Sequence, residues 1–225
     1  NAMKAGKEKR GGIIHCNINP NEIDNIIEPH YKVQCDAELF TTELLKHIQY
    51  KCRKIWLDQI YQWKIMNPFT YKRIINKIKT QDVIFELNNQ LSNKNLYENT
   101  IISSGVGNHQ MMAAQFIKWK YPNKFITSGS LGVMGVGLPY AIGCQIGNPN
   151  SLVIDIDGDG SFNHTLSDLK TIVEYNLPIK IIVLNDHNQS MVRIWEELFY
   201  DKRYTATSNH KNPKYHKLAK SYKIK

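Results

Sequence analysis

Hydrophobic and polar positions in the second half of the chain predict a βαβ unit. Residues 152–156 form a short, mostly apolar run that ends at the glycine-rich turn 158–160. Apolar residues then recur at helical spacing over 162–175, and a β-branched apolar run at 179–184 ends at Asn185-Asp186. Strands that are apolar along their length are typical of parallel sheets with both faces covered. We therefore predict an α/β fold, a mostly parallel sheet with helices on both faces.

Looser patterns predict the elements elsewhere along the chain. Those within residues 11–36 are too short to bury a hydrophobic core alone. The dense glycines of residues 125–143 predict close packing of backbones. The further predicted elements are strands at 12–17, 31–35 and 100–103, and helices at 21–27, 36–65, 109–119 and from residues 81 and 188 onward.

Two carboxylates follow the strands of the βαβ unit directly. A right-handed crossover makes these strands parallel, so Asp159 and Asp186 lie past carboxyl ends at one edge of the sheet, where such folds bind ligands. Taken alone, a Gly-Asp-Gly turn is more often a structural turn with capping side chains. The second oxygen pair favours a magnesium ion that holds a phosphate. A second glycine loop, at 105–110, also follows a strand and precedes a helix.

Longer stretches of sequence carry a resemblance to one family. Gly-Asp-Gly, the 24 residues 161–184 and then Asn-Asp resemble the thiamine-diphosphate motif. The runs SGVGNHQMMAAQFIKWKYPNKFITSGSLGVMGVGLPYAIG, VIDIDGDGSFNHTLSDL and MVRIWEELFY resemble the acetohydroxyacid synthase (acetolactate synthase) large subunit. The match is dense over 100–215 and weaker over RGGIIHCNINP at 10–20.

The resemblance implies how the chain is organised. Residues 1–36 would be the remnant of a middle, FAD-type domain, preceded by an expression tag at Asn1-Ala2. Residues 37–80 would be a helical linker. Residues 81–225 would be the thiamine-diphosphate- and Mg²⁺-binding catalytic domain, incomplete at its C-terminal end.

The resemblance also implies the site residues. Magnesium would be held by Asp159, Asp186 and the backbone carbonyl of Asn188, and Val192 and Trp195 would shape the substrate slot. The cofactor contacts implied are Val106, Gly107, Asn108, His109, Gly132, Met134, Gly158, Asp159, Gly160, Ser161, Asp186, Asn188 and Met191.

Simpler interpretations of several of these side chains stay open. Met134 at helical spacing is more often core, because methionine is an adaptable filler. His109 is more plausibly a hydrogen-bonding group than a metal ligand. Met191, Val192 and Trp195 could equally form a buried amphipathic helix face.

The chain departs from the family pattern at three site positions. Asn108 stands where the family usually has Gln, and Asp186 where it has a second Asn. Aspartate still offers oxygen to magnesium, but it adds a negative charge beside the diphosphate. Ser190 replaces a Gly, so the local backbone differs if that position needs a positive φ.

The implied activity is decarboxylation of pyruvate and its condensation with a second 2-keto acid, pyruvate or 2-ketobutyrate, in branched-chain amino acid biosynthesis. The glutamate that activates the cofactor belongs to a different domain in the family, so we expect no catalytic residue in this chain and no activity from it alone. Family members are homodimers or tetramers, with a possible regulatory subunit.

Two other functions remain open. One is a non-catalytic remnant that binds cofactor or a partner. The other is a different thiamine-diphosphate decarboxylase or oxidase, against which Trp195 and the run 109–111 favour the synthase.

Charge and composition change this picture little. The net charge is +9, but the basic stretches at 4–10, 72–79 and 211–225 carry no nucleic-acid-binding motif, so we predict solvated surface. Four cysteines are widely spaced, which suggests reduced thiols in an intracellular protein. No apolar run of membrane-spanning length and no signal peptide is visible, so we expect no membrane partner.

Overall fold

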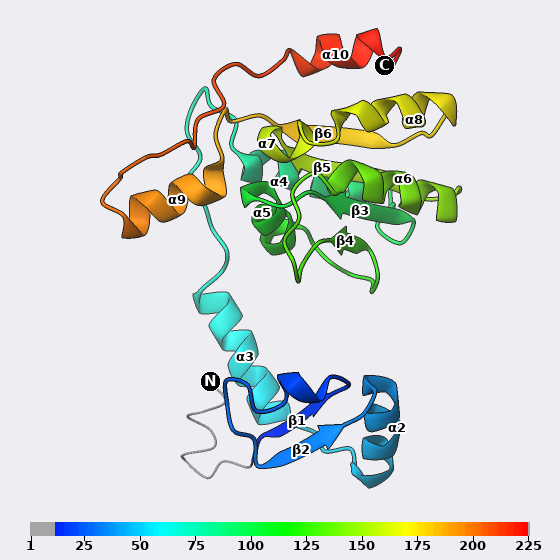
Figure 1. Ribbon diagram of the computed structural model, residues 1–225, viewed down its shortest axis with the longest axis vertical. Helices are drawn as coiled ribbons and strands as arrows, with labels where there is room; N and C mark the ends of the chain where they lie inside the picture. Colours follow the sequence, from blue (N-terminus) through cyan, green and yellow to red (C-terminus); the bar gives the residue numbers. More distant parts are fainter. Residues whose placement is uncertain (1–11, 225) are drawn as a thin grey trace. The chain divides into compact units, whose positions relative to one another are not determined.

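The computed structural model describes residues 12–224 and divides the chain into two compact units, the first ending at Pro68 and the second beginning at Phe69 (Figure 1). This division falls within the linker predicted at 37–80. The domain boundaries at 36 and 80 stay a prediction. The predicted tag and the basic residues 4–10 lie outside the described residues. None of the described helices combines the length and apolar character that crossing a membrane requires.

The first unit is a small α/β arrangement around two parallel strands. Strand β1 pairs with β2, and Cys16 lies opposite Val33. Among residues 12–68, only Pro29 is buried, as expected of a segment too short for its own core. Its elements are β1 Ile14–Asn17, the 3₁₀ turn η1 Pro20–Glu22, β2 Tyr31–Gln34, α2 Ala37–His47 and α3 Lys54–Met66.

The second unit is built on a four-stranded, wholly parallel sheet in the order β4-β3-β5-β6. Its strands are β3 Thr100–Ser104, β4 Phe125–Thr127, β5 Leu152–Gly158 and β6 Lys180–Leu184. Its helices are α4 Thr80–Asn93, α5 Asn108–Phe116, α6 Gly137–Gly147, α7 Asp159–Phe162, η2 Leu166–Asp168, α8 Leu169–Glu174, α9 Ser190–Phe199 and α10 Tyr215–Ser221. The predicted fold class is confirmed.

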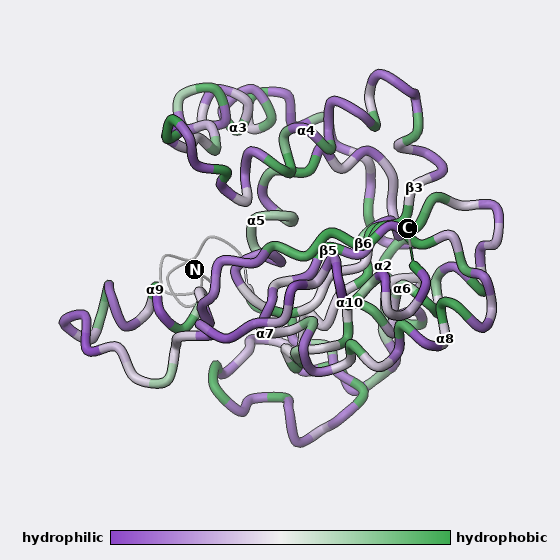
Figure 2. Tube along the Cα trace, turned by 90° about the horizontal axis from the view of Figure 1, so that it is seen from above, coloured by the Kyte–Doolittle hydropathy of each residue, from purple (hydrophilic) through white to green (hydrophobic). Residues whose placement is uncertain are grey.

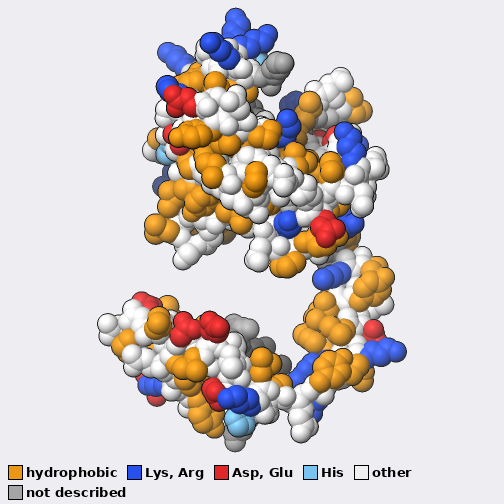
Figure 3. Space-filling model, turned by 90° about the vertical axis from the view of Figure 1, so that its right-hand side faces the viewer, with side chains coloured by type: hydrophobic (Ala, Val, Ile, Leu, Met, Phe, Trp, Pro, Cys, Tyr) orange, Lys and Arg blue, Asp and Glu red, His pale blue; other side chains and the backbone are white. Residues whose placement is uncertain are grey.

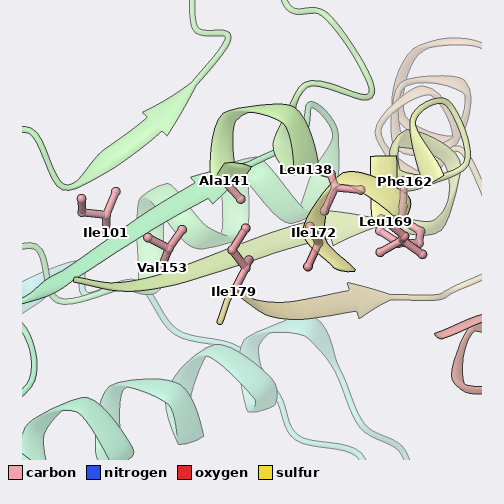
Figure 4. Close-up of a cluster of buried hydrophobic side chains, with 8 residues drawn as sticks. All are labelled: Ile101, Leu138, Ala141, Val153, Phe162, Leu169, Ile172 and Ile179. Carbon is pink, nitrogen blue, oxygen red and sulfur yellow. The ribbon is translucent and has the colours of Figure 1, made fainter. Parts of the chain in front are cut away.

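Alternate residues of the strands feed two separate hydrophobic clusters, one on each face of the sheet. On one face, Ile101 and Val153 pack with residues of α6 and α8 (Figure 4). On the other face, Ile102 and Ile154 pack against α4 and α5. The apolar run of β6 appears as a green stretch in Figure 2. A sheet covered on both faces explains why its strands read as apolar.

Three predicted helices are wrong in detail. The helix expected at 36–65 is two helices, α2 and α3, and neither has a buried residue that would hold them as one. The helix expected at 21–27 is only the 3₁₀ turn at 20–22, because Asp24 adopts a left-handed φ of 72°. The helix expected at 162–175 is divided among α7, η2 and α8.

Three elements were absent from the predictions: β4, α10 and α6, which lies in the glycine-rich stretch. Strand β4 has three residues, too few for a periodic signal, and the short α10 lies in the basic segment 211–225. Lysine and arginine side chains gather over this C-terminal end of the chain (Figure 3). The lysines of α10 are exposed, as predicted for a solvated surface.

Candidate functional site

The carboxyl ends of β3, β5 and β6 meet at one edge of the sheet, and a pocket opens there. All thirteen of the cofactor contacts implied by resemblance line this pocket, and so does Val192. Their roles stay predictions, but the structure brings them together from four separate stretches of sequence. The pocket is also lined by Ser190, already noted as a departure from the family pattern, and by three residues that were not predicted: Thr80, Leu184 and Gln189.

Glycines shape the two loops that would face a phosphate. A Cβ on Gly105 would lie 2.1 Å from Asp157 Oδ1 and 2.2 Å from Ser161 Oγ, so no side chain fits there. A Cβ on Gly158 would lie 2.6 Å from His109 Nδ1. The loop after β3 leads into the N-terminus of α5, whose free N–H groups favour an anion.

Buried acidic groups lie directly beneath these loops. Asp155 and Asp157 are fully buried in β5, and His109 Nε2 lies 3.3 Å from Asp157 Oδ1. Burial raises the pKa of Asp155 well above its ordinary value, and the charge of Asp157 raises this pKa further. The hydrogen bond from Ser103 lowers the pKa, but by less. Burial therefore favours the protonated form of the Asp155 carboxyl. His109 Nε2 thus faces a buried carboxylate but makes no hydrogen bond within residues 12–224, so the role of His109 stays a prediction.

The glycine-rich segment before α6 is fastened to α7. Ser161 Oγ accepts a hydrogen bond from the backbone N–H of Gly135 at 2.8 Å, and Thr165 Oγ1 donates to the Gly135 carbonyl at 2.7 Å. Gly132 and Gly135 adopt left-handed φ values of 73° and 85°. This path brings Met134 to the pocket. Met134 belongs to neither buried hydrophobic cluster, which argues against a core role.

Asp159 is almost completely buried, with 1 % of its surface exposed. Its Oδ2 accepts hydrogen bonds from the side-chain amides of Asn209, at 3.2 Å, and Asn212. No donor among residues 12–224 bonds to its other oxygen, Oδ1, and Oδ1 is not among the partnerless atoms sealed from solvent. One carboxylate oxygen thus stays available for a ligand in the pocket.

The two departures at Asp186 and Ser190 are linked in the structure. The Ser190 hydroxyl donates to Asp186 Oδ2, and the Asn188 N–H donates to Asp186 Oδ1 at 3.1 Å. Ser190 is the first residue of α9 and does not have a positive φ, so it needs no glycine there. The serine therefore holds the aspartate at the position where the family has asparagine.

These residues fit a magnesium ion that also binds a diphosphate. No group of three or more His, Cys, Asp or Glu side chains within residues 12–224 could hold a metal by itself. Magnesium does not need such a group, because it usually takes one or two carboxylates and completes its octahedron with phosphate oxygens and water. Asp159 with its available oxygen, Asp186 and the backbone of Asn188 supply a donor set of that kind.

The predicted substrate residues on α9 lie in different surroundings. Val192 lines the pocket, whereas Trp195 does not and packs against Phe199 with ring centroids 5.3 Å apart. Val192 and Trp195 are 54 % and 58 % exposed in this chain. They therefore do not form the buried amphipathic face that was the simpler alternative.

Comparison with known families agrees with this geometry. Residues 105–225 match the thiamine pyrophosphate enzyme, C-terminal TPP binding domain. The chain belongs to this family. The matched segment includes every predicted cofactor contact, from Val106 to Met191.

Relatives of the TPP domain described here are named acetolactate synthases, which confirms the resemblance. Over its whole length, the chain is 43 % identical to the mitochondrial acetolactate synthase of Schizosaccharomyces pombe, and the match covers 34 % of that protein. The chain is also 43 % identical to the mitochondrial acetolactate synthase catalytic subunit of Saccharomyces cerevisiae, and this match covers 33 % of that protein. With chloroplastic acetolactate synthase 1 of Nicotiana tabacum, identity is 38 % over 90 % of this chain and 31 % of that protein. The chain spans about a third of the length of these relatives.

Sequence reasoning missed the residues that support the site from behind. Asp155 and Asp157 interrupt an apolar strand. Two carboxylates at alternate positions of a run expected to be buried could have indicated a functional site. Asn209 and Asn212 reach Asp159 across about fifty positions of sequence, and no spacing rule connects them.

Proposed function

We propose that this chain binds thiamine diphosphate and Mg²⁺ as the diphosphate-gripping part of an acetolactate synthase. One observation carries the proposal: residues from four separated motifs line a single pocket at the carboxyl edge of a parallel sheet. That edge is where open α/β folds bind ligands.

Each part of the pocket has a chemical role in this proposal. The loop 105–109 and the start of α5 bind the diphosphate through backbone N–H groups. Asp159, Asp186 and the carbonyl of Asn188 hold Mg²⁺ against it. Met134, which is half-buried, lies under the organic rings and supports their orientation.

The proposed reaction joins two 2-keto acids. Bound thiamine diphosphate supplies the carbon centre that makes decarboxylation of pyruvate possible. The chain's own part is to position the cofactor and to shape the acceptor slot with Val192 and Trp195, so that pyruvate and 2-ketobutyrate are distinguished by size. No carboxylate of this sequence matches the family's activating glutamate. We therefore expect the 225 residues alone to form no acetolactate from pyruvate.

Names of the relatives support the proposed setting. The relative from Saccharomyces cerevisiae is named a catalytic subunit and that from Cyanidium caldarium a large subunit, which implies a regulatory partner. Relatives are named mitochondrial or chloroplastic, so we propose that this protein works inside the cell. FAD, which the resemblance implies for the preceding domain, stays a prediction.

Isothermal titration calorimetry tests the proposal. Thiamine diphosphate is titrated into the purified chain with Mg²⁺ and with EDTA, and we expect binding only with Mg²⁺. Asp159→Ala should abolish it, whereas Asp58→Ala, an exposed carboxylate on α3, should leave it unchanged. Equal binding by wild type and Asp159→Ala would reject the proposed site.

A further inference from the structure

The buried carboxylate of Asp159 is held by a segment far along the chain. Asn209 Nδ2 and Asn212 Nδ2 both donate to Oδ2, and Asp159 itself is 1 % exposed. Both asparagines therefore present their NH₂ groups to one oxygen of the carboxyl group, which accepts the two hydrogen bonds.

Asn212 connects the ends of two strands. Besides Asp159, which directly follows β5, its NH₂ group donates to Asn185 Oδ1 at 2.9 Å, directly after β6. Its carbonyl oxygen accepts from Asn163 Nδ2 at 3.1 Å. Both donor hydrogens and the acceptor of this one amide are therefore used, and its orientation is fixed.

The segment that carries the asparagines is itself tied to the second ligand loop. The Gln189 N–H donates to the Thr207 carbonyl at 2.8 Å, and the Asn209 N–H donates to the His187 carbonyl at 2.7 Å. These bonds pair residues 187–189 with 207–209 in a short antiparallel bridge. The Thr207 side chain is buried, which anchors the segment further.

We propose that Asn209 and Asn212 are positioning residues for the metal site. They occupy Oδ2 of Asp159, so that Oδ1 is the oxygen left to face the pocket, and Asn212 fixes the β5 end relative to the β6 end, where Asp186 and Asn188 lie. This inference rests on the proposed function. It goes beyond that function because it assigns the control of ligand geometry to residues outside the pocket lining.

The expected effect follows from the general behaviour of groups behind metal ligands. Removing a partner that orients a ligand typically weakens metal affinity roughly 10- to 100-fold. The Asn212 side chain makes three hydrogen bonds, whereas the Asn209 side chain makes one, to the same oxygen of Asp159. Asn212→Ala should therefore lose more metal affinity than Asn209→Ala. Asn89, which donates to the Glu86 carboxylate at 3.4 Å on the surface of α4, provides a matched control.

The test measures Mn²⁺ binding to the full chain by electron paramagnetic resonance, with thiamine diphosphate at saturation. We expect the dissociation constant for Mn²⁺ to rise roughly 10- to 100-fold in Asn212→Ala. It should rise by less in Asn209→Ala and not at all in Asn89→Ala. Thermal unfolding without metal is followed in parallel, and binding is measured well below each melting temperature.

The outcomes separate this inference from the proposed function. If wild type binds Mn²⁺ and both asparagine variants bind it equally well, the positioning role is wrong and the cofactor site stands. A lower melting temperature with an unchanged dissociation constant would assign the asparagines a structural role only and also overturn the inference. If Asn212→Ala does not fold, weakened binding by Asn209→Ala still decides. Wild type that binds no better than Asp159→Ala would reject both proposals.

Discussion

Gly137, the first residue of α6, is the position where the fold of the site is most sensitive to one added carbon. A Cβ there would lie 2.5 Å from the Gly105 N, 2.7 Å from Asp155 Oδ1 and 2.8 Å from Asp157 Oδ2. All three atoms are buried: one is a backbone nitrogen, and the other two end the short side chains of fully buried aspartates. Overpacking typically costs about 1–3 kcal/mol, and three simultaneous contacts below 3 Å put Gly137→Ala near about 3 kcal/mol.

Gly143 provides the matched control on the same helix. No atom lies within 4 Å of its added Cβ, so Gly143→Ala should gain the ordinary helix preference for alanine, about 0.5–1 kcal/mol. The two variants should therefore differ by about 4 kcal/mol. With a urea dependence near 2 kcal/mol per molar, that is about 2 M between their unfolding midpoints.

The assay is urea unfolding followed by far-UV circular dichroism for wild type and both variants. The expected order of midpoints is Gly143→Ala above wild type and Gly137→Ala well below it. Coinciding midpoints for the two variants would refute the reasoning, because the contacts at Gly137 would then have no energetic consequence.

Two further predictions concern titratable groups whose pKa is raised by burial. Because burial, and secondarily Asp157, raise the pKa of Asp155, the folded chain binds a proton that the unfolded chain releases, so stability falls as pH rises above about 4. Asp155→Asn should flatten the fall in melting temperature between pH 5 and 8, and parallel curves would contradict this. Tyr215→Phe should lose about 1 kcal/mol in urea unfolding, because the hydroxyl bonds to Asn163 Oδ1 at 3.1 Å. Burial first, then the charge of Asp159, raise the pKa of Tyr215 to about 12, so a phenolate absorbance difference between wild type and variant at pH 10 would count against it.

The hydrophobic pattern of the sequence predicted three of the four strands of the larger sheet. The strands now labelled β3, β5 and β6 are where their apolar runs predicted, because each is covered on both faces and had to be apolar. Asp159, Asp186 and the glycine loop at 105–110 were predicted because they follow strand ends in sequence, whereas the individual cofactor contacts were implied by the family resemblance. Strand β4 was missed because three residues carry no period.

Other features depend on contacts that no local pattern encodes. The break within 162–175 accompanies the bonds of Ser161 and Thr165 to Gly135, about thirty residues earlier. Of the glycines expected to pack closely, Gly135 and Gly137 do so, whereas Gly129 and Gly143 have open space around them. The hydrogen bonds that Asp159 accepts from Asn209 and Asn212 likewise come from residues about fifty positions away in the sequence. The frame of the site was thus readable from the sequence, and the groups that hold it from behind were not.

The most direct test of the account is a crystal structure of the chain with thiamine diphosphate and Mn²⁺, with the metal located by anomalous scattering. We expect one Mn²⁺ peak in contact with Asp159 Oδ1, Asp186 and the carbonyl of Asn188, and the diphosphate against the loop 105–109. Cofactor bound elsewhere, or a diphosphate in the pocket with no metal peak beside Asp159, would contradict it.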